Sequence, residues 1–168
     1  MLYSQLELAA YDPTKAKFLR GLRTSDVRAV MVDVAVCLAQ QVDRASDLQL
    51  DLQEATVPIE PSHLGKIVEE LLNNAFRYSS PGSPVRVRCA TEDERVLVLS
   101  AMDRGRGMTR AQIAQVGAYM QFDREQYEQQ GQGLGLTIAK RLAELHGGEL
   151  TIESVPRLTT AVQVMLPL

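Results

Sequence analysis

The chain has 168 residues, of which 45% are hydrophobic and 23% charged, and its formal net charge is -3; this is the profile of one folded domain and excludes a mainly disordered chain. The slight negative charge supplies no overall positive field for nucleic acid or anionic lipid, so an anionic ligand would need a local site. No apolar run approaches the roughly 20 residues that span a bilayer, and we expect a cytoplasmic protein with no membrane segment in this chain. Cys37 and Cys89 lack metal-ligand spacing, and we expect two reduced, buried thiols.

The first half of the chain alternates helical and extended patterns. Residues 1–12 have helical spacing and end at a proline, as the tail of a longer helix would. Apolar residues at intervals of three and four predict an amphipathic helix over 27–42. Alternating leucines predict a half-buried strand at 48–52. A second helix is expected from Pro61 to about Ser79, where a proline- and glycine-containing turn follows.

The second half begins with two strand patterns at 85–89 and 96–100, joined by a charged turn at 92–94. Residues 103–135 are polar and rich in glycine, with a short helical stretch around 112–116. A connection of this length is usually functional.

The remaining elements complete the fold. A third helix is predicted from Leu134 to Leu145, ended by the glycine pair 147–148. Two more strands are expected at 149–153 and 161–166. Helices and hairpins in this order predict an α+β fold, a two-layer sandwich with a mixed, mostly antiparallel sheet covered by helices.

The helix expected at 61–79 has one apolar and one polar side. Glu70 and Asn74 are four residues apart and stack on consecutive turns, with the guanidinium of Arg77 about one turn further on. A carboxylate, an amide oxygen and a cation in this order suit a magnesium-bound phosphate. A solvated helix face is the alternative.

A glycine loop follows the strand at 96–100. Asp103 stands at the strand end, and Gly105, Gly107 and Met108 come next. The glycines would let the backbone approach a flat ligand while the carboxylate accepts a hydrogen bond, for instance from an amino group on a base. A plain turn is the alternative.

A second glycine loop opens the third helix. It comprises Gly131, Gly133, Leu134, Gly135 and Leu136 in the run Gly-Gln-Gly-Leu-Gly-Leu. Free N–H groups at a helix start can cradle phosphate. The loop lacks the ending of a Walker motif and does not follow a strand, so neither a P-loop nor a dinucleotide-binding motif fits.

Together the three segments resemble the boxes of sensor histidine kinases. Residues 70–79 resemble the N box, 103–107 the G1 box and 131–136 the G2 box, and the likeness continues through 143–150 to the closing Leu-Pro. The combination, over about residues 48–168, is similar to the catalytic and ATP-binding domain of a two-component histidine kinase on the Bergerat ATPase fold.

This resemblance implies ATP and Mg²⁺ as cofactors and assigns roles to individual residues. Asn74 would ligate Mg²⁺, Glu70 would be the acid/base or water-organising carboxylate, and Asp103 would receive the adenine amino group. Arg77, an arginine where the family usually has lysine, would meet phosphate, and Tyr78 would pack near the nucleotide. The other implied binding residues are Gly105, Gly107 and Met108 at the base, and Gly131, Gly133, Leu134, Gly135 and Leu136 at the phosphates.

The resemblance also implies an activity and partners. The chain would transfer the γ-phosphate of ATP to a histidine on a dimerisation domain that this chain lacks, with residues 1–12 as the tail of that domain or a linker and 13–168 as the catalytic domain. A response regulator receiver domain would be a further partner, and a monomer is expected. The alternatives are a nucleotide-dependent binding module without kinase activity and an anti-sigma-type serine kinase.

The sequence also allows predictions for four further residues and one segment. His63 and His146 lack the surroundings of a phosphoacceptor, so a surface or capping role is expected for both. Arg104 and Arg106 are expected to be solvated. The polar segment 117–131, in which the family's F box is altered, is expected to form a lid that nucleotide orders.

Overall fold

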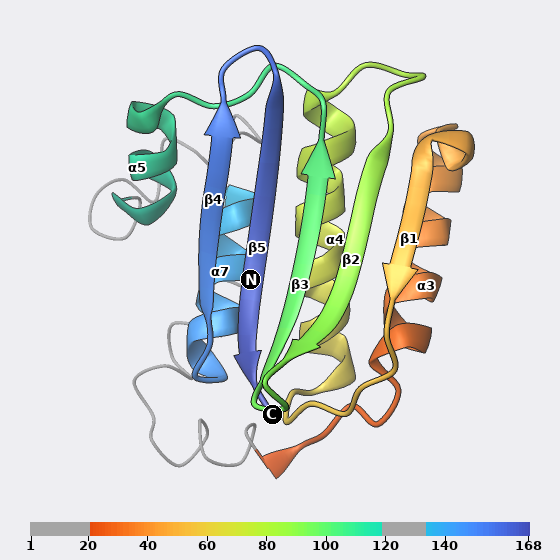
Figure 1. The fold of residues 1–168 in the computed structure, drawn as a ribbon, viewed down its shortest axis with the longest axis vertical. Helices are drawn as coiled ribbons and strands as arrows, with labels where there is room; N and C mark the ends of the chain where they lie inside the picture. Colours follow the sequence, from red (N-terminus) through yellow and green to blue (C-terminus); the bar gives the residue numbers. More distant parts are fainter. Residues whose placement is uncertain (1–20, 119–133) are drawn as a thin grey trace.

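The computed structural model describes residues 21–118 and 134–168 (Figure 1). The expected tail at 1–12, Gly131, Gly133 and nearly all of the expected lid lie outside the described residues. The elements are α3 (Val27–Gln41), the 3-10 turn η1 (Ala45–Asp47), β1 (Leu48–Leu52), α4 (Pro61–Tyr78), β2 (Val85–Glu92), β3 (Val96–Asp103), α5 (Arg110–Ala118), α7 (Leu134–Leu145), β4 (Glu149–Val155) and β5 (Thr159–Pro167).

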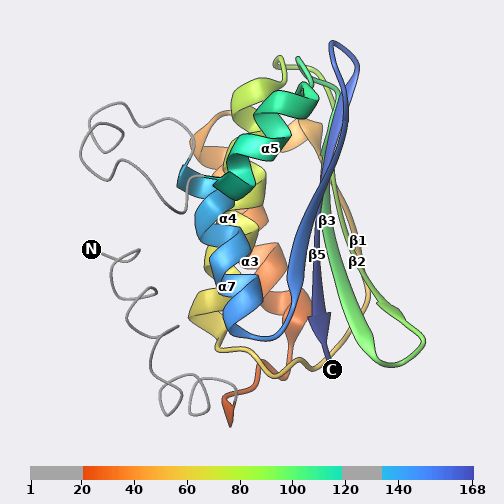
Figure 2. The ribbon, with the colours of Figure 1, turned by 90° about the vertical axis from the view of Figure 1, so that its left-hand side faces the viewer.

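The strands form one sheet in the order β1-β2-β3-β5-β4. The β1–β2 pair is parallel and the other three pairs are antiparallel. Figure 2 shows α3, α4 and α7 together on one face of this sheet, and no described helix on the other. The predicted two-layer α+β sandwich with a mixed, mostly antiparallel sheet is therefore confirmed.

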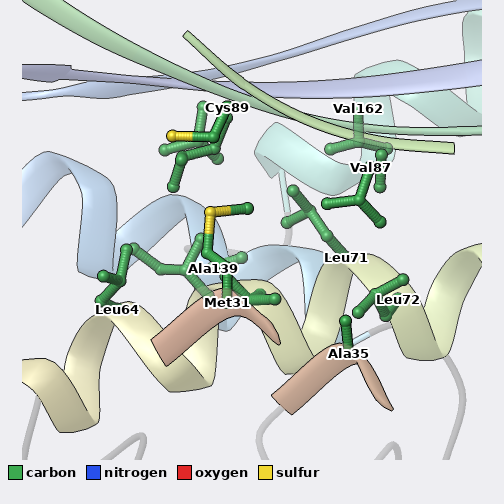
Figure 3. Close-up of a cluster of buried hydrophobic side chains, with 14 of the residues drawn as sticks. Met31, Ala35, Leu64, Leu71, Leu72, Val87, Cys89, Ala139 and Val162 are labelled. Atoms are coloured by element: carbon green, nitrogen blue, oxygen red, sulfur yellow. The ribbon is translucent and has the colours of Figure 1, made fainter. Parts of the chain in front are cut away.

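The hydrophobic core fills the space between the helices and the sheet (Figure 3). Helix α4 runs through its middle, and Pro61 stands at its start because the fixed φ of proline suits the first helical turn. The whole apolar side of this helix is buried: Leu64, Ile67, Val68, Leu71, Leu72, Ala75 and Phe76. The spacing of apolar residues in the sequence therefore predicted this helix correctly. Its polar side faces away from the core and is available for binding or catalysis.

Four strands, β2 to β5, and one helix, α5, are longer than the sequence pattern predicts. Strand β3 continues to Asp103 because the pairing with β5 continues to Thr160. Helix α5 spans Arg110–Ala118 instead of about 112–116. Asp103 is the last residue of β3, as expected for a residue at the strand end, and the loop 103–108 begins there.

The two cysteines differ in their surroundings. Cys89 is buried, as expected, and burial raises the pKa of its thiol to about 11. Cys37 is exposed, so the expectation of burial is wrong for this residue. Helix α3 packs through Val27, Met31, Ala35 and Ala39, and Cys37 is two positions, about 200°, away from that stripe.

Across the described ranges, no helix combines the length and the apolar character needed to cross a membrane.

Candidate functional site

The loop after β3 is held on one side by the β4–β5 hairpin. Thr159 Oγ1 donates to the carbonyl oxygen of Asp103 at 2.8 Å, and the Met108 backbone N–H donates to Ser154 Oγ at 2.8 Å. A third bond runs from the Arg157 N–H to the carbonyl oxygen of Arg106, at 2.7 Å. The hairpin thus fixes both ends and the middle of the loop 103–108.

The other side of this loop rests on the C-terminal end of α4. The Arg106 N–H donates to the carbonyl oxygen of Tyr78 at 3.1 Å, and the Arg106 guanidinium carbon lies 3.9 Å from the centre of the Tyr78 ring. Arg106 is exposed, as expected, but it stacks on an aromatic ring rather than being merely solvated.

Two glycines allow this close approach. A Cβ on Gly105 would collide with the carbonyl oxygen of Tyr78, and a Cβ on Gly107 would collide with that of Val155. Gly107 also has a φ of +66°, in the left-handed region that favours glycine. The loop is therefore wedged between α4 and the hairpin, and both glycines are required by the backbone geometry.

Asp103 is a buried carboxylate with unused hydrogen-bonding capacity. The residue is 2% exposed, and no group within the described residues donates to its Oδ1 atom. Burial raises the pKa of this carboxyl to about 6, although the Gly105 N–H and the positive charge of Arg44 act in the opposite direction. A buried acceptor without a donor costs free energy, so this atom is suited to an external donor.

The polar side of α4 is more ordered than a solvated helix face. Lys66 Nζ lies 2.6 Å from Glu70 Oε1 and 3.1 Å from Glu69 Oε2. The Glu70 side chain is only 13% exposed, and Asn74 on the next turn is partly buried. Arg77 is exposed. Glu70 is therefore held by an ion pair, and the partly buried Asn74 stands one turn further along the same side of the helix.

The second glycine loop reaches Glu70. A Cβ on Gly135, in the first turn of α7, would collide with Glu70 Oε2. The structure thus brings together two residues that are 65 positions apart and that the sequence placed in separate motifs. Leu134 is partly buried, whereas Leu136 is buried in the core.

The predicted residues fall into two groups joined by α4. Asp103, Gly105 and Tyr78 meet at its C-terminal end, and Glu70 meets Gly135 two turns earlier. Asn74 lies on the same polar side between the two groups. Gly131 and Gly133 lie outside the described residues.

A metal ion at this site would need ligands beyond the side chains. In the part of the chain that the structure describes, no group of three or more His, Cys, Asp or Glu residues could hold a metal ion. Asn74 offers one amide oxygen, so the remaining ligands would have to be phosphate oxygens or water.

The two histidines form a contact that the sequence did not reveal. His63 Nδ1 and His146 Nε2 are 3.0 Å apart, which joins the first turn of α4 to the residue after α7. His146 is only 4% exposed, so a surface role is wrong for it, and its place at the helix end agrees with the capping alternative. Burial lowers the pKa of His63, against the opposing effect of Glu60.

Sequence reasoning missed two cations near the site. Lys66 is the first of them, and its spacing of four from Glu70 on the same helix is a usable signal for their ion pair. Arg44 is buried between η1 and the end of α4 and was not singled out. Nothing in its local sequence distinguishes it from a surface arginine.

Comparisons with known proteins give matches over more than half of the chain. Residues 59–168 match the profile of the family described as histidine kinase-, DNA gyrase B-, and HSP90-like ATPase. The chain is 34% identical over 125 residues to the circadian input-output histidine kinase CikA of Synechococcus elongatus, which covers 72% of this chain and 16% of that protein. It is also 34% identical over 109 residues to the sensor protein TorS of Escherichia coli, covering 65% of this chain and 12% of that protein.

A solved structure is similar over most of the chain. The mycobacterial sensor histidine kinase MprB superposes with a TM-score of 0.71 at 27% sequence identity, covering 88% of this chain and 97% of that one. By contrast, the chain spans less than a fifth of the length of CikA or TorS.

Proposed function

Because the chain belongs to the histidine kinase-, DNA gyrase B-, and HSP90-like ATPase family, we propose that it is the ATP-binding and catalytic domain of a two-component histidine kinase. It would transfer the γ-phosphate of ATP to a histidine on a dimerisation domain. The observation that carries this proposal is the buried Oδ1 atom of Asp103, which lacks a donor within the described residues and stands beside the close-packed Gly105.

The base end of the site is formed by Asp103, Tyr78 and the glycine loop. In our proposal Asp103 accepts a hydrogen bond from the adenine amino group, which gives its buried oxygen the missing donor. Gly105 and Gly107 let the loop that would line the base pack against the carbonyl oxygens of Tyr78 and Val155. Met108 stands at the end of this loop, and Tyr78 would pack near the base. An oxo group at the same position of the base, as in guanine, would face the carboxylate as a second acceptor. The site therefore favours adenine.

The phosphate end is formed by α4 and the start of α7. Asn74 would hold Mg²⁺, and Arg77 would face a phosphate. Gly131, Gly133, Leu134 and Gly135 would supply backbone around the phosphates, and the buried Leu136 would anchor that turn in the core. When bound, Mg²⁺ neutralises charge on the phosphate oxygens. The positive end of a helix adds to this effect.

The chemical step needs positioning more than covalent help from the protein. An imidazole nitrogen of the acceptor forms a bond to the γ-phosphorus, the bond from that phosphorus to the bridging oxygen breaks, and ADP leaves. The attacking nitrogen uses its lone pair and carries no proton, so the imidazole releases the proton of its other ring nitrogen. Glu70 would receive it or orient the acceptor, and its contact with Lys66 at 2.6 Å holds the carboxylate in place.

The proposed partners are a dimerisation domain that carries the phosphorylated histidine and a response regulator receiver domain. CikA and TorS are several times longer than this chain, which supports the idea that such domains accompany it. Transfer to a separate dimerisation domain would be slow, because the high effective concentration of a linked acceptor is lost.

The test is phosphate transfer in trans. The chain, labelled Mg-ATP and a separately made dimerisation domain are mixed, and acid-labile phosphate on that domain is measured. Asn74→Ala should abolish transfer because it removes the metal ligand, whereas Asn73→Ala, an exposed neighbour on the same helix, should retain it.

Three other results would contradict the proposal in different ways. ATP binding without transfer would favour the binding-module alternative. Acid-stable phosphate on a partner serine would favour the serine kinase. Acid-labile label on this chain alone, lost in His63→Ala or His146→Ala, would show that the chain carries its own acceptor.

A further inference from the structure

Arg44 lies in the protein interior at the C-terminal end of α4, outside the residues 59–168 that match the family profile. Its side chain is 5% exposed. Burying a guanidinium is costly unless it is fully hydrogen-bonded. None of the roles proposed above uses this residue.

Every nitrogen of the guanidinium has an acceptor within hydrogen-bond distance. Nε donates to the Asp47 carboxylate at 2.7 Å. The two terminal nitrogens donate to the end of α4 and to the turn that follows it: to the carbonyl oxygens of Phe76 at 2.9 Å, Ser79 at 3.0 Å, Ser80 at 2.8 Å and Ser83 at 2.9 Å, and to Ser79 Oγ at 3.0 Å. One side chain therefore ties the last turn of the helix to the next five residues.

Asp47 completes this arrangement. The same carboxylate oxygen that accepts from Arg44 also accepts from the Gly82 N–H, at 2.9 Å. The hydrogen bond from Arg44 holds the pKa of Asp47 below its usual range. The pair thus stays charged at neutral pH and clamps the turn from two directions.

The clamped segment carries one wall of the base site. Tyr78 lies between Phe76 and Ser79, whose carbonyl oxygens Arg44 binds. The carbonyl oxygen of Tyr78 accepts from Arg106 and leaves no room for a side chain on Gly105. A shift at the end of α4 would therefore be passed on directly to the loop 103–108.

We propose that Arg44 is a positioning residue for base recognition: its guanidinium fixes the end of α4 and the turn after it, and so sets where Tyr78 and Asp103 stand relative to an adenine ring. Lysine cannot substitute, because one ammonium group cannot reach Asp47, the helix end and Ser83 together. This inference rests on the proposed function, since it assumes that a purine binds there.

The experiment compares binding of Mg-ATP and Mg-GTP, because the two nucleotides share their triphosphate and differ in the base. Wild-type chain should bind ATP more tightly than GTP. In Arg44→Lys the ATP affinity should fall by roughly tenfold or more, the scale expected for a misplaced binding group, with little change for GTP. The ratio of the two affinities should therefore shrink toward one. A change that affects only folding stability would weaken the binding of both nucleotides to the same extent.

Asp47→Asn is a second, milder variant, because it keeps the side-chain shape and removes only the charge that Arg44 pairs with. Its ATP-to-GTP ratio should shrink in the same direction, and it decides the question if Arg44→Lys does not fold in circular dichroism and thermal melting. Arg88→Lys is the control: it alters an exposed arginine that lies 3.6 Å from the exposed Asp51 on the open face of the sheet. Its ratio should equal that of the wild type.

The measured ratios distinguish a failure of the positioning role of Arg44 from a failure of the proposed nucleotide site. If the wild-type chain shows no preference for ATP over GTP, the proposed nucleotide site is wrong. If the wild type prefers ATP and the folded variants at Arg44 and Asp47 keep that ratio, the proposed site stands and the positioning role of Arg44 is refuted.

Discussion

Replacing Asp103 by asparagine should stabilise the nucleotide-free protein and weaken its binding of ATP. The carboxyl has a folded-state pKa raised by burial from 3.8 to about 6. A carboxyl with a raised pKa binds its proton more tightly in the folded state, so stability falls as the pH rises from about 3.8 through about 6 and is not regained above it. At pH 7.5 the folded protein therefore holds a buried negative charge at a cost.

The size of this cost follows from the same pKa difference. It corresponds to at most about 3 kcal/mol in the free energy of unfolding. Asparagine removes the charge and keeps an oxygen that can accept from the Gly105 N–H. Its new NH₂ group needs an acceptor, however, and burying this group without one cancels part of the increase in the free energy of unfolding. We expect Asp103→Asn to be more stable than the wild type by about 1–2 kcal/mol at pH 7.5, and no more stable near pH 4.

The affinity for ATP should change in the opposite sense. An amide NH₂ can face the adenine amino group donor to donor, and the loss of the charged acceptor is worth about 1.5–3 kcal/mol. Urea denaturation without nucleotide, at pH 7.5 and pH 4, gives the stability term, and calorimetric titration gives the affinity. Asp51→Asn, an exposed carboxylate on the open face of the sheet, is the control for both. An Asp103→Asn variant no more stable than wild type at pH 7.5 would refute the electrostatic reasoning, and unchanged affinity would refute base recognition by this residue.

Two further predictions follow from single contacts. Gly105→Ala places a methyl group against the carbonyl oxygen of Tyr78. It should cost about 1–3 kcal/mol of stability and abolish measurable ATP binding, whereas Gly65→Ala, whose new methyl would meet Val34 at 3.6 Å, should bind normally; equal behaviour in calorimetry and melting would contradict the close packing. Burial lowers the pKa of His63, so the unfolded state takes up the proton first, and the contribution of this residue to stability should decline as the pH falls below about 6.5, opposite in sign to that of Asp103. Urea denaturation between pH 7.5 and 5.5 should show that the wild type loses stability relative to His63→Gln as the pH falls, and identical slopes would exclude an effect of His63.

The sequence predicted those parts of the protein that depend on local periodicity. The apolar residues of α4 repeat at helical spacing from Leu64 to Phe76, a little more than three turns, and all of them are buried. Glu70 and Asn74 could be singled out because they stand four residues apart on one face of a helix, and Asp103 because it ends a strand and precedes two glycines. These signals need no knowledge of how distant segments pack.

Tertiary contacts between distant residues could not be predicted in the same way. The approach of Gly135 to Glu70 and the pairing of His63 with His146 join residues 65 and 83 positions apart. Arg44 is the clearest case, because its acceptors are mostly backbone carbonyl oxygens, which every residue possesses. A pattern of side chains contains no trace of such a contact.

The strand order has a consequence for how the chain folds. The β2–β3 hairpin and the β4–β5 hairpin each form from neighbouring segments, but they join only where β3 pairs with β5. At this seam Thr159 meets Asp103, 56 positions away in the chain. Closing a loop of that length costs chain entropy before any contact compensates for it, and such non-local pairing slows folding. We therefore expect docking of the two hairpins to be the rate-limiting event in folding, so that the loop 103–108, whose contacts with β4 and β5 cross this seam, is positioned last.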